Sequence, residues 1–187
     1  MSLTNLLIPT YMQMLKTLSA WLDKAQAQMG DEAESLLSAR LAPDMFPLST
    51  QIRFACVQAQ EGVFRLKGEE FPAALQGLLD EGRNAGDNPG SIASAKHRID
   101  ETITWLEGLS KAALDGDAER PIEHALPMGV IFDLTAEEYA RDWTVPQFYF
   151  HLMIAYAILR NQGVALGKGD YVTHMFAYLR PGTMPSD

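Results

Sequence analysis

Residues 144–169 read TVPQFYFHLMIAYAILRNQGVALGKG, the most informative segment of the chain for its architecture. In its apolar part, 145–159, only Gln147 and His151 are strongly polar. A helix on the surface of a bundle shows a polar face, whereas a helix that is apolar on nearly every side belongs in the interior. The stretch therefore predicts a buried helix that carries one histidine.

Both ends of this helix have sequence signals. Thr144, followed three residues later by Gln147, is typical of a capping box at a helix start. Gly163 is typical of the left-handed residue that follows a helix end. The expected helix therefore begins just after Thr144 and ends before Gly163.

Three earlier segments show the same helical spacing of apolar residues. They cover residues 8–29, 48–67 and 92–109. Pro9 lies in the first turn of the first segment or kinks the helix there. With the helix after residue 144, they predict an all-α fold, a four-helix bundle with a long crossover after the third helix.

The connections between these helices predict smaller elements within one domain, 1–187. Residues 122–134 lack helical spacing and contain Val-Ile-Phe, which favours a short β-strand or hairpin between helices three and four. Shorter helices are expected at 32–39, around 72–82 and at 135–143. The tail, 164–187, is punctuated by Gly and Pro and is expected to be mostly irregular.

Composition limits the partners of this domain. The chain has 187 residues and a formal net charge of −9, from 24 acidic and 15 basic residues. Nucleic acids and anionic membrane surfaces attract basic proteins, so we expect neither as a partner. Cys56 is the single cysteine, which excludes an internal disulfide and favours a cytoplasmic location. Its apolar surroundings predict a buried, inert thiol.

His151 is the strongest candidate for chemistry among the four histidines. The others are His97, in a charged segment that predicts exposure, and His124 and His174, in segments without a specific signal. No histidine has another at a spacing of three or four residues, so the sequence lacks a helical metal-binding pair.

Two interpretations of His151 remain open at this point. In one it is a core histidine, hydrogen-bonded to a backbone carbonyl or to a side chain such as Asp44 or Gln51. In the other it is a ligand or a general base that faces a pocket. A buried imidazole needs a partner in either case, because an unpaired polar group costs about 1–3 kcal/mol.

Several segments resemble the DinB/YfiT-like superfamily of four-helix proteins, and most closely its uncharacterised branch, the domain of unknown function 1993. They are Ala42–Leu48 with Gln51-Ile52, Arg98–Ile103, Phe148–His151, Ala155–Arg160, Gly163-Val164 and Gly167-Lys168. The resemblance implies the bundle fold for nearly the whole chain, homodimerisation, and residues 69–91 as an insertion. Better-known members of the superfamily are metal-dependent and include thiol S-transferases and an isomerase.

The sequence departs from the metal site that the resemblance implies. Those members hold a divalent metal with one histidine near the start of helix two and a HxxxH pair on helix four. His151 matches the first position of the pair, but Ala155 stands at the second, and helix two begins with Ser49, Thr50 and Gln51. A zinc-type site needs at least three protein ligands. We therefore expect no cofactor, with a divalent metal at His151 only if a partial site persists.

Two functions follow as hypotheses. The first is a metal-free binding or structural module, with a small-molecule pocket lined by Asp44, Gln51, His151 and Tyr156. The second is an enzyme of thiol-transfer or isomerase type, in which His151, helped by Asp44, is a base or the remaining metal ligand. Phe54 and Trp105 are the candidates for exposed apolar residues in a dimer contact.

Overall fold

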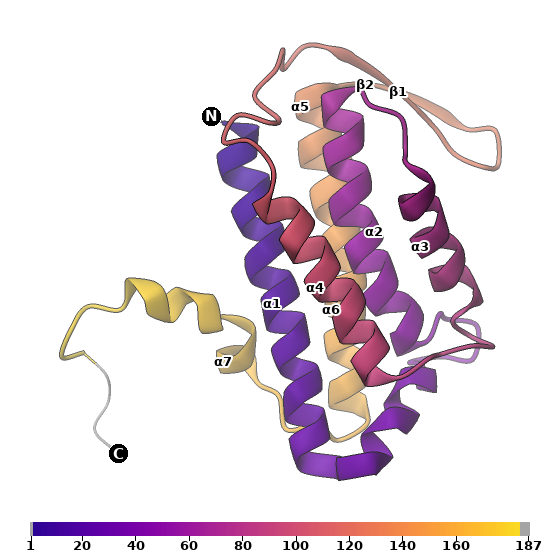
Figure 1. Ribbon diagram of the computed structural model, residues 1–187, viewed down its shortest axis with the longest axis vertical. Helices are drawn as coiled ribbons and strands as arrows, with labels where there is room; N and C mark the ends of the chain where they lie inside the picture. Colours follow the sequence, from indigo (N-terminus) through magenta and orange to yellow (C-terminus); the bar gives the residue numbers. More distant parts are fainter. Residues whose placement is uncertain (1, 184–187) are drawn as a thin grey trace.

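Four long helices lie side by side in the computed structural model of the protein, which describes residues 2–183 (Figure 1). They are α1 (Leu3–Met29), α2 (Leu48–Lys67), α4 (Ile92–Glu107) and α6 (Val145–Asn161). The predicted all-α four-helix bundle is confirmed. Since α1 begins at Leu3, Pro9 lies inside the helix rather than at its start. No helix within 2–183 is long and apolar enough to cross a membrane.

The ends of these helices follow from local sequence. The Ser2 hydroxyl accepts a hydrogen bond from the backbone N–H of Asn5 and caps α1. Ser91 and Ser94 form a reciprocal capping box at the start of α4. Gly68, at φ +70°, ends α2 in the left-handed region, which glycine adopts without strain.

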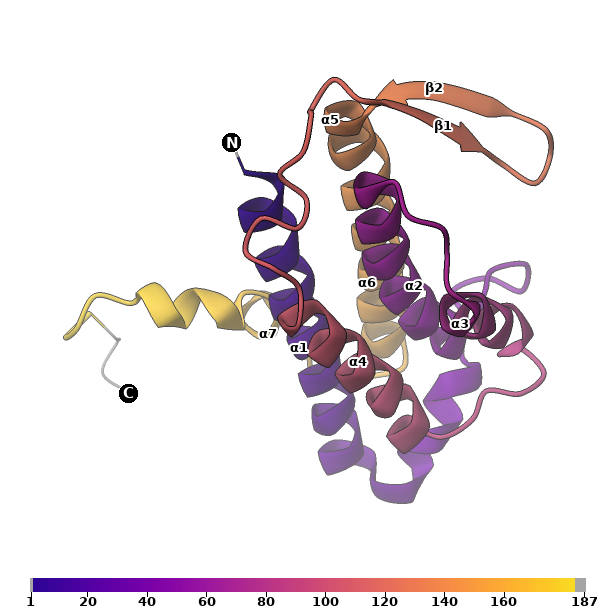
Figure 2. The same cartoon turned by 45° about the horizontal axis from the view of Figure 1, so that its top comes forward.

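Shorter elements fill the connections. Between the long helices lie η1 (Gly30–Ser38), α3 (Ala73–Asn84), β1 (Pro121–Ala125) and β2 (Ile131–Thr135). The two strands are antiparallel, with Ile122 opposite Leu134, and they form the predicted hairpin beyond the ends of α2 and α6 (Figure 2).

The tail is more helical than expected. It contains α7 (Lys168–Tyr171) and η3 (Thr173–Tyr178), so the prediction of a mostly irregular tail is wrong for these residues. Asp170 explains the first turn, because its carboxylate accepts a hydrogen bond from the backbone N–H of Gly167 at 2.7 Å. Residues 184–187 lie outside the described residues.

The predicted capping box at Thr144 is wrong. The helix starts earlier, at α5 (Ala136–Glu138), where Thr135 and Glu138 form the capping box. The chain then continues through a π-helical turn, η2 (Tyr139–Thr144), directly into α6. Thr144 is helical and its hydroxyl lies 3.1 Å from the phenolic oxygen of Tyr11, so its side chain joins α6 to α1 instead of capping it.

One face of α6 is buried and another is not. The apolar residues that face the core are Phe148, Leu152, Ala155, Ile158 and Leu159. A stripe of apolar and aromatic residues on a different face, Val145, Tyr149, Met153 and Tyr156, is partly exposed. The prediction of a helix buried on nearly every side is therefore too strong. Gly163, at φ +86°, ends the helix as predicted.

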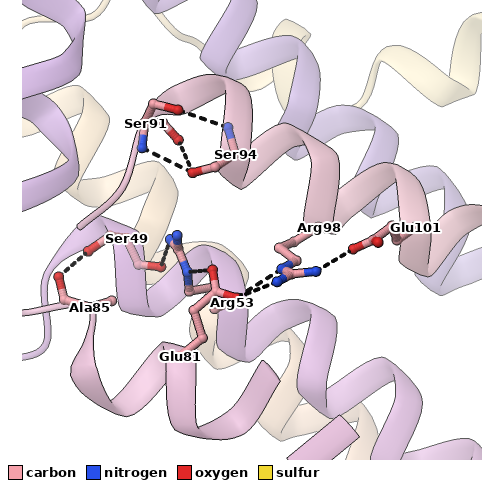
Figure 3. A network of polar contacts seen from close by, with 8 residues as sticks. All are labelled: Ser49, Arg53, Glu81, Ala85, Ser91, Ser94, Arg98 and Glu101. Atoms are coloured by element: carbon pink, nitrogen blue, oxygen red, sulfur yellow. Dashed lines mark hydrogen bonds and ion pairs between the residues drawn. The ribbon is translucent and has the colours of Figure 1, made fainter. Parts of the chain in front are cut away.

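A partly buried ion-pair network, which the sequence analysis did not predict, joins α3 to α2 and α4 (Figure 3). Arg53 on α2 is 2% exposed, and its Nε donates to Glu81 of α3 at 2.6 Å. Arg98 of α4 donates to the other oxygen of the same carboxylate at 2.9 Å. Burial favours a higher pKa for Glu81, but the hydrogen bonds from Arg53 and Arg98 outweigh it and leave the pKa lowered.

Candidate functional site

His151 lies where α6 packs antiparallel against α2. It is 9% exposed, and its Nδ1 is 2.9 Å from Oε1 of Gln51, in the first turn of α2. The antiparallel packing also places Gly62, near the other end of α2, against Thr144 before α6. The two residues of the site are thus held by the best-packed helix pair of the bundle rather than by loops.

The hydrogen bonds of Gln51 determine the proton position on His151. The amide Nε2 of Gln51 donates to the backbone oxygen of Phe46 at 3.2 Å, so its Oε1 is the atom that faces the imidazole. An amide oxygen only accepts, and His151 must therefore carry its proton on Nδ1. Nε2 is left with a free lone pair. It has no hydrogen-bond partner within 2–183 and is not enclosed, so this lone pair is open to solvent.

Aromatic rings surround the imidazole. The rings of Phe54 and Phe150 lie edge-on to it, with centroids at 5.2 and 5.3 Å, and Phe46 lies 5.6 Å from Phe54. Phe150 is 55% exposed and Phe46 is also exposed. The site is therefore a polar atom set in an apolar, partly open surface.

Burial lowers the pKa of His151 to about 4. Desolvation disfavours the imidazolium, and Gln51 brings no charge to compensate for it. At neutral pH the side chain is a neutral hydrogen-bond acceptor.

The structure brings together two of the four residues predicted for the pocket. Gln51 and His151 are in contact, as one of the open interpretations proposed. Asp44 is exposed, and within 2–183 no hydrogen bond or ion pair joins its carboxylate to another side chain. Tyr156 packs on Trp21 of α1 at 5.2 Å, because five residues along a helix turn it to a different face from His151. Asp44 and Tyr156 were therefore not brought together with Gln51 and His151 as the sequence predicted.

The principal pockets of residues 2–183 lie elsewhere. Two of them are a groove of about 450 Å³ beside Arg65 and Arg120 and a groove of about 380 Å³ beside Leu6 and Val145. Neither is lined by Gln51 or His151. The predicted pocket around His151 therefore coincides with neither groove.

The side chains do not fit the metal site of the superfamily. Within 2–183, no three His, Cys, Asp or Glu side chains are grouped so that they could hold a metal ion. The oxygen that faces His151 Nδ1 comes from the neutral amide of Gln51. A single imidazole and an amide are too few ligands for a zinc-type site.

The other residues considered for chemistry are the single cysteine and the remaining histidines. Cys56 is buried, and burial raises its thiol pKa to about 12. His97 is exposed, as predicted. His124, which the sequence left without a role, lies on the inner side of β1 between Tyr139 and Trp143, and neither of its ring nitrogens has a partner within the described chain. A β-strand places Ile122 and His124 on the same face, and this spacing of two residues was the available sequence signal.

The fold defines a helical-bundle protein of DinB type, and its described part, residues 2–183, has no group of three side chains that could hold a metal ion. A family model described as "Domain of unknown function (DUF1993)" matches residues 3–172. The chain belongs to this family.

A solved structure supports the same assignment. The chain is similar to a DinB family member protein from Shewanella denitrificans, with 34% sequence identity and a TM-score of 0.73. The match covers 98% of this chain and 96% of that one. No functionally curated protein matches the sequence.

Proposed function

We propose that this protein is a metal-free binding module whose ligand contacts His151. The observation that carries the proposal is the fixed tautomer, which leaves Nε2 with an unpaired lone pair on an imidazole that lies beside half-exposed Phe54 and exposed Phe150. A ligand that fits this surface combines a hydrogen-bond donor, such as a hydroxyl or N–H group, with an apolar or aromatic part. Small-molecule sites usually have this composition, a few placed polar groups in an apolar lining.

The pKa of His151 favours binding over catalysis. A general base is most effective when its pKa lies near the working pH. A histidine with a pKa of about 4 accepts a proton poorly at neutral pH, although it still accepts a hydrogen bond. The alternative, a thiol transferase or isomerase, needs either a better base or a metal-ligand set.

We also propose that the protein is a homodimer in the cytoplasm. The dimer is what the resemblance to the DinB/YfiT-like superfamily implies. The two aromatic residues first considered for the contact are only half-exposed, since Phe54 packs on Phe46 and Trp105 stacks on Phe64. A free, buried Cys56 is compatible with a reducing compartment.

A fragment screen followed by NMR tests the binding proposal. Phenols, indoles and anilides should shift the ring resonances of His151, whereas matched fragments without a donor should bind at least about tenfold more weakly, because a lost hydrogen bond costs about 1.4 kcal/mol. His151→Phe keeps an aromatic ring but removes the acceptor, and it should abolish the preference for donors. His97→Phe, on an exposed position of α4, is the matched control.

Two outcomes contradict the proposal. One is a screen in which no fragment perturbs His151. The other is donor-containing fragments that bind wild type and His151→Phe equally well.

A further inference from the structure

The chain leaves the bundle after α7 as an apolar arm, residues 173–180 (Figures 1 and 2). Its large exposed side chains are Met175, Phe176, Tyr178 and Leu179. Tyr178 is 79% exposed, the highest value of the four. Contiguous exposed apolar side chains of this kind mark contact surfaces, because they gain free energy when a partner removes them from water.

The base of the arm is firmly attached. Asp170 accepts a hydrogen bond from Lys24 at 2.8 Å, and its backbone oxygen accepts one from Trp21 Nε1 at 3.3 Å. The Tyr171 ring stacks on Trp21 with centroids 6.4 Å apart. The arm therefore starts from a defined point on α1, whereas its distal residues, 175–180, are exposed.

An apolar groove lies toward the other end of the same pair of helices. Leu3 and Leu6 from α1 and Ala140 and Val145 from the η2–α6 segment line about 380 Å³. Leu6 is 45% exposed. The groove is thus an apolar cleft open to solvent, the chemical complement of the arm.

The partly exposed stripe of α6 connects the groove with the base of the arm. Val145 lines the groove, Tyr149 and Met153 follow along the helix, and Tyr156 packs on Trp21 at the arm base. The four residues follow each other at spacings of three and four and so share one side of the helix. Arm base, stripe and groove consequently form one continuous face, called here the α1–α6 face.

The groove and the arm also carry charges of opposite sign. Glu137 borders the groove and is exposed, and Arg180 directly follows the apolar residues of the arm. The ion pairs within 2–183 include neither of them. The other charged residue of the groove, Arg141, is already paired with Asp142 at 2.6 Å.

We infer that two copies of the chain pack their α1–α6 faces together and exchange arms. A two-fold axis that lies in the interface, perpendicular to α1 and between arm base and groove, makes the α1 helices antiparallel and brings each arm over the groove of the partner. Met175 to Leu179 then cover Leu6 and Val145 of the other copy, and Arg180 pairs with its Glu137. The contact is the same in both directions, as a two-fold interface requires. The inference rests on the proposed homodimer and specifies its surface.

Charge reversal tests the exchange in the full-length protein. Glu137→Arg and Arg180→Glu each place like charges at both arm–groove contacts, which should weaken the dimer roughly 10- to 100-fold in sedimentation equilibrium. Both positions are exposed, so circular dichroism should show an unchanged fold. The double variant should regain the wild-type dissociation constant. Glu32→Arg, an exposed reversal on η1, is the control and should leave the dimer unchanged.

A mixture of the two single variants is the decisive sample. Each heterodimer then has one Arg–Arg chain and one Glu–Glu chain, so both contacts across the interface are complementary. Mixing should restore a tight dimer, whereas a pair within one chain could not be rescued in this way.

The outcomes separate the two proposals. A wild-type protein that stays monomeric at about 100 μM overturns both the homodimer and the exchange. A stable wild-type dimer that neither reversal weakens, or whose weakened variants do not recover on mixing, overturns the exchange alone.

Discussion

The amide oxygen of Gln51 lies 2.9 Å from Nδ1 of His151, a contact between helices one hundred residues apart in sequence. The same amide donates to the backbone oxygen of Phe46, which leaves it no freedom to present its nitrogen to the imidazole. Near Gln51, at the start of helix two, the resemblance to the DinB-like superfamily implies a metal-binding histidine. Here an uncharged acceptor fixes one tautomer of a neutral histidine instead.

Gln51→Glu should raise the pKa of His151. A carboxylate within hydrogen-bond distance stabilises the imidazolium, so we expect an increase of about 1–3 pH units above the wild-type value of about 4. NMR titration of the ring protons measures it, with the exposed His97 as an internal reference. An unchanged His151 titration would mean that the residue-51 side chain does not contact the imidazole.

The pKa of His151 also predicts how stability depends on pH. The unfolded chain binds this proton with a pKa of about 6.5, and the folded chain only near 4, so between these values the unfolded state binds more protons. The free energy of unfolding therefore rises from pH 4 to pH 6.5, by at most about 3 kcal/mol from this residue.

Urea titrations across that pH range measure the effect. His151→Phe should remove the share due to His151, leaving a flatter profile. His124, whose pKa burial also lowers, contributes in the same direction and remains in the variant. Parallel profiles for wild type and His151→Phe would show that His151 is not the titrating group.

Gly62→Ala should destabilise the bundle. A Cβ at this position would clash with Oγ1 of Thr144 and lie 3.1 Å from the oxygen of Tyr11, so α2 or the Thr144 side chain must shift. Overpacking of this kind costs about 1–3 kcal/mol. Gly77→Ala, on α3 with nothing within 4 Å of the added carbon, should instead stabilise by about 0.5–1 kcal/mol. Urea midpoints that move in the same direction for both variants would contradict the close helix contact.

Removal of Glu81 should cost more than replacement of its buried partner. Glu81→Ala leaves the Arg53 guanidinium buried without its counter-charge, and we expect a loss of about 2–4 kcal/mol. Arg53→Met keeps the side-chain volume and leaves Glu81 paired with Arg98, so its loss should be smaller. Glu101→Ala, at the exposed end of the network, should change the unfolding free energy by less than about 0.5 kcal/mol. Equal losses for all three variants would mean that burial of Arg53 is not what makes the network costly to break.

Local sequence was sufficient for most of the fold. The caps at Ser91 and Gly68, the hairpin around 122–134 and the helical spacing of apolar residues each depend on near neighbours in the chain. The signal at Thr144 failed because a capping box is a local pattern, whereas the helix there continues through a π turn and Thr144 bonds with distant Tyr11. The Arg53–Glu81–Arg98 network was missed because its three residues come from three helices.

The sequence likewise predicted part of the candidate site, and the packing of the helices decided the rest. His151 stands out in an apolar run, and Ala155 occupies the position where the resemblance to the superfamily implies a second metal ligand, so both observations come from the sequence. Which residue His151 meets depends on the rotation and register of α2 against α6. That packing selected Gln51, left Asp44 in solvent and turned Tyr156 toward Trp21. Local periodicity determines which residues form helices, whereas only the packed helices decide which side chains share a face.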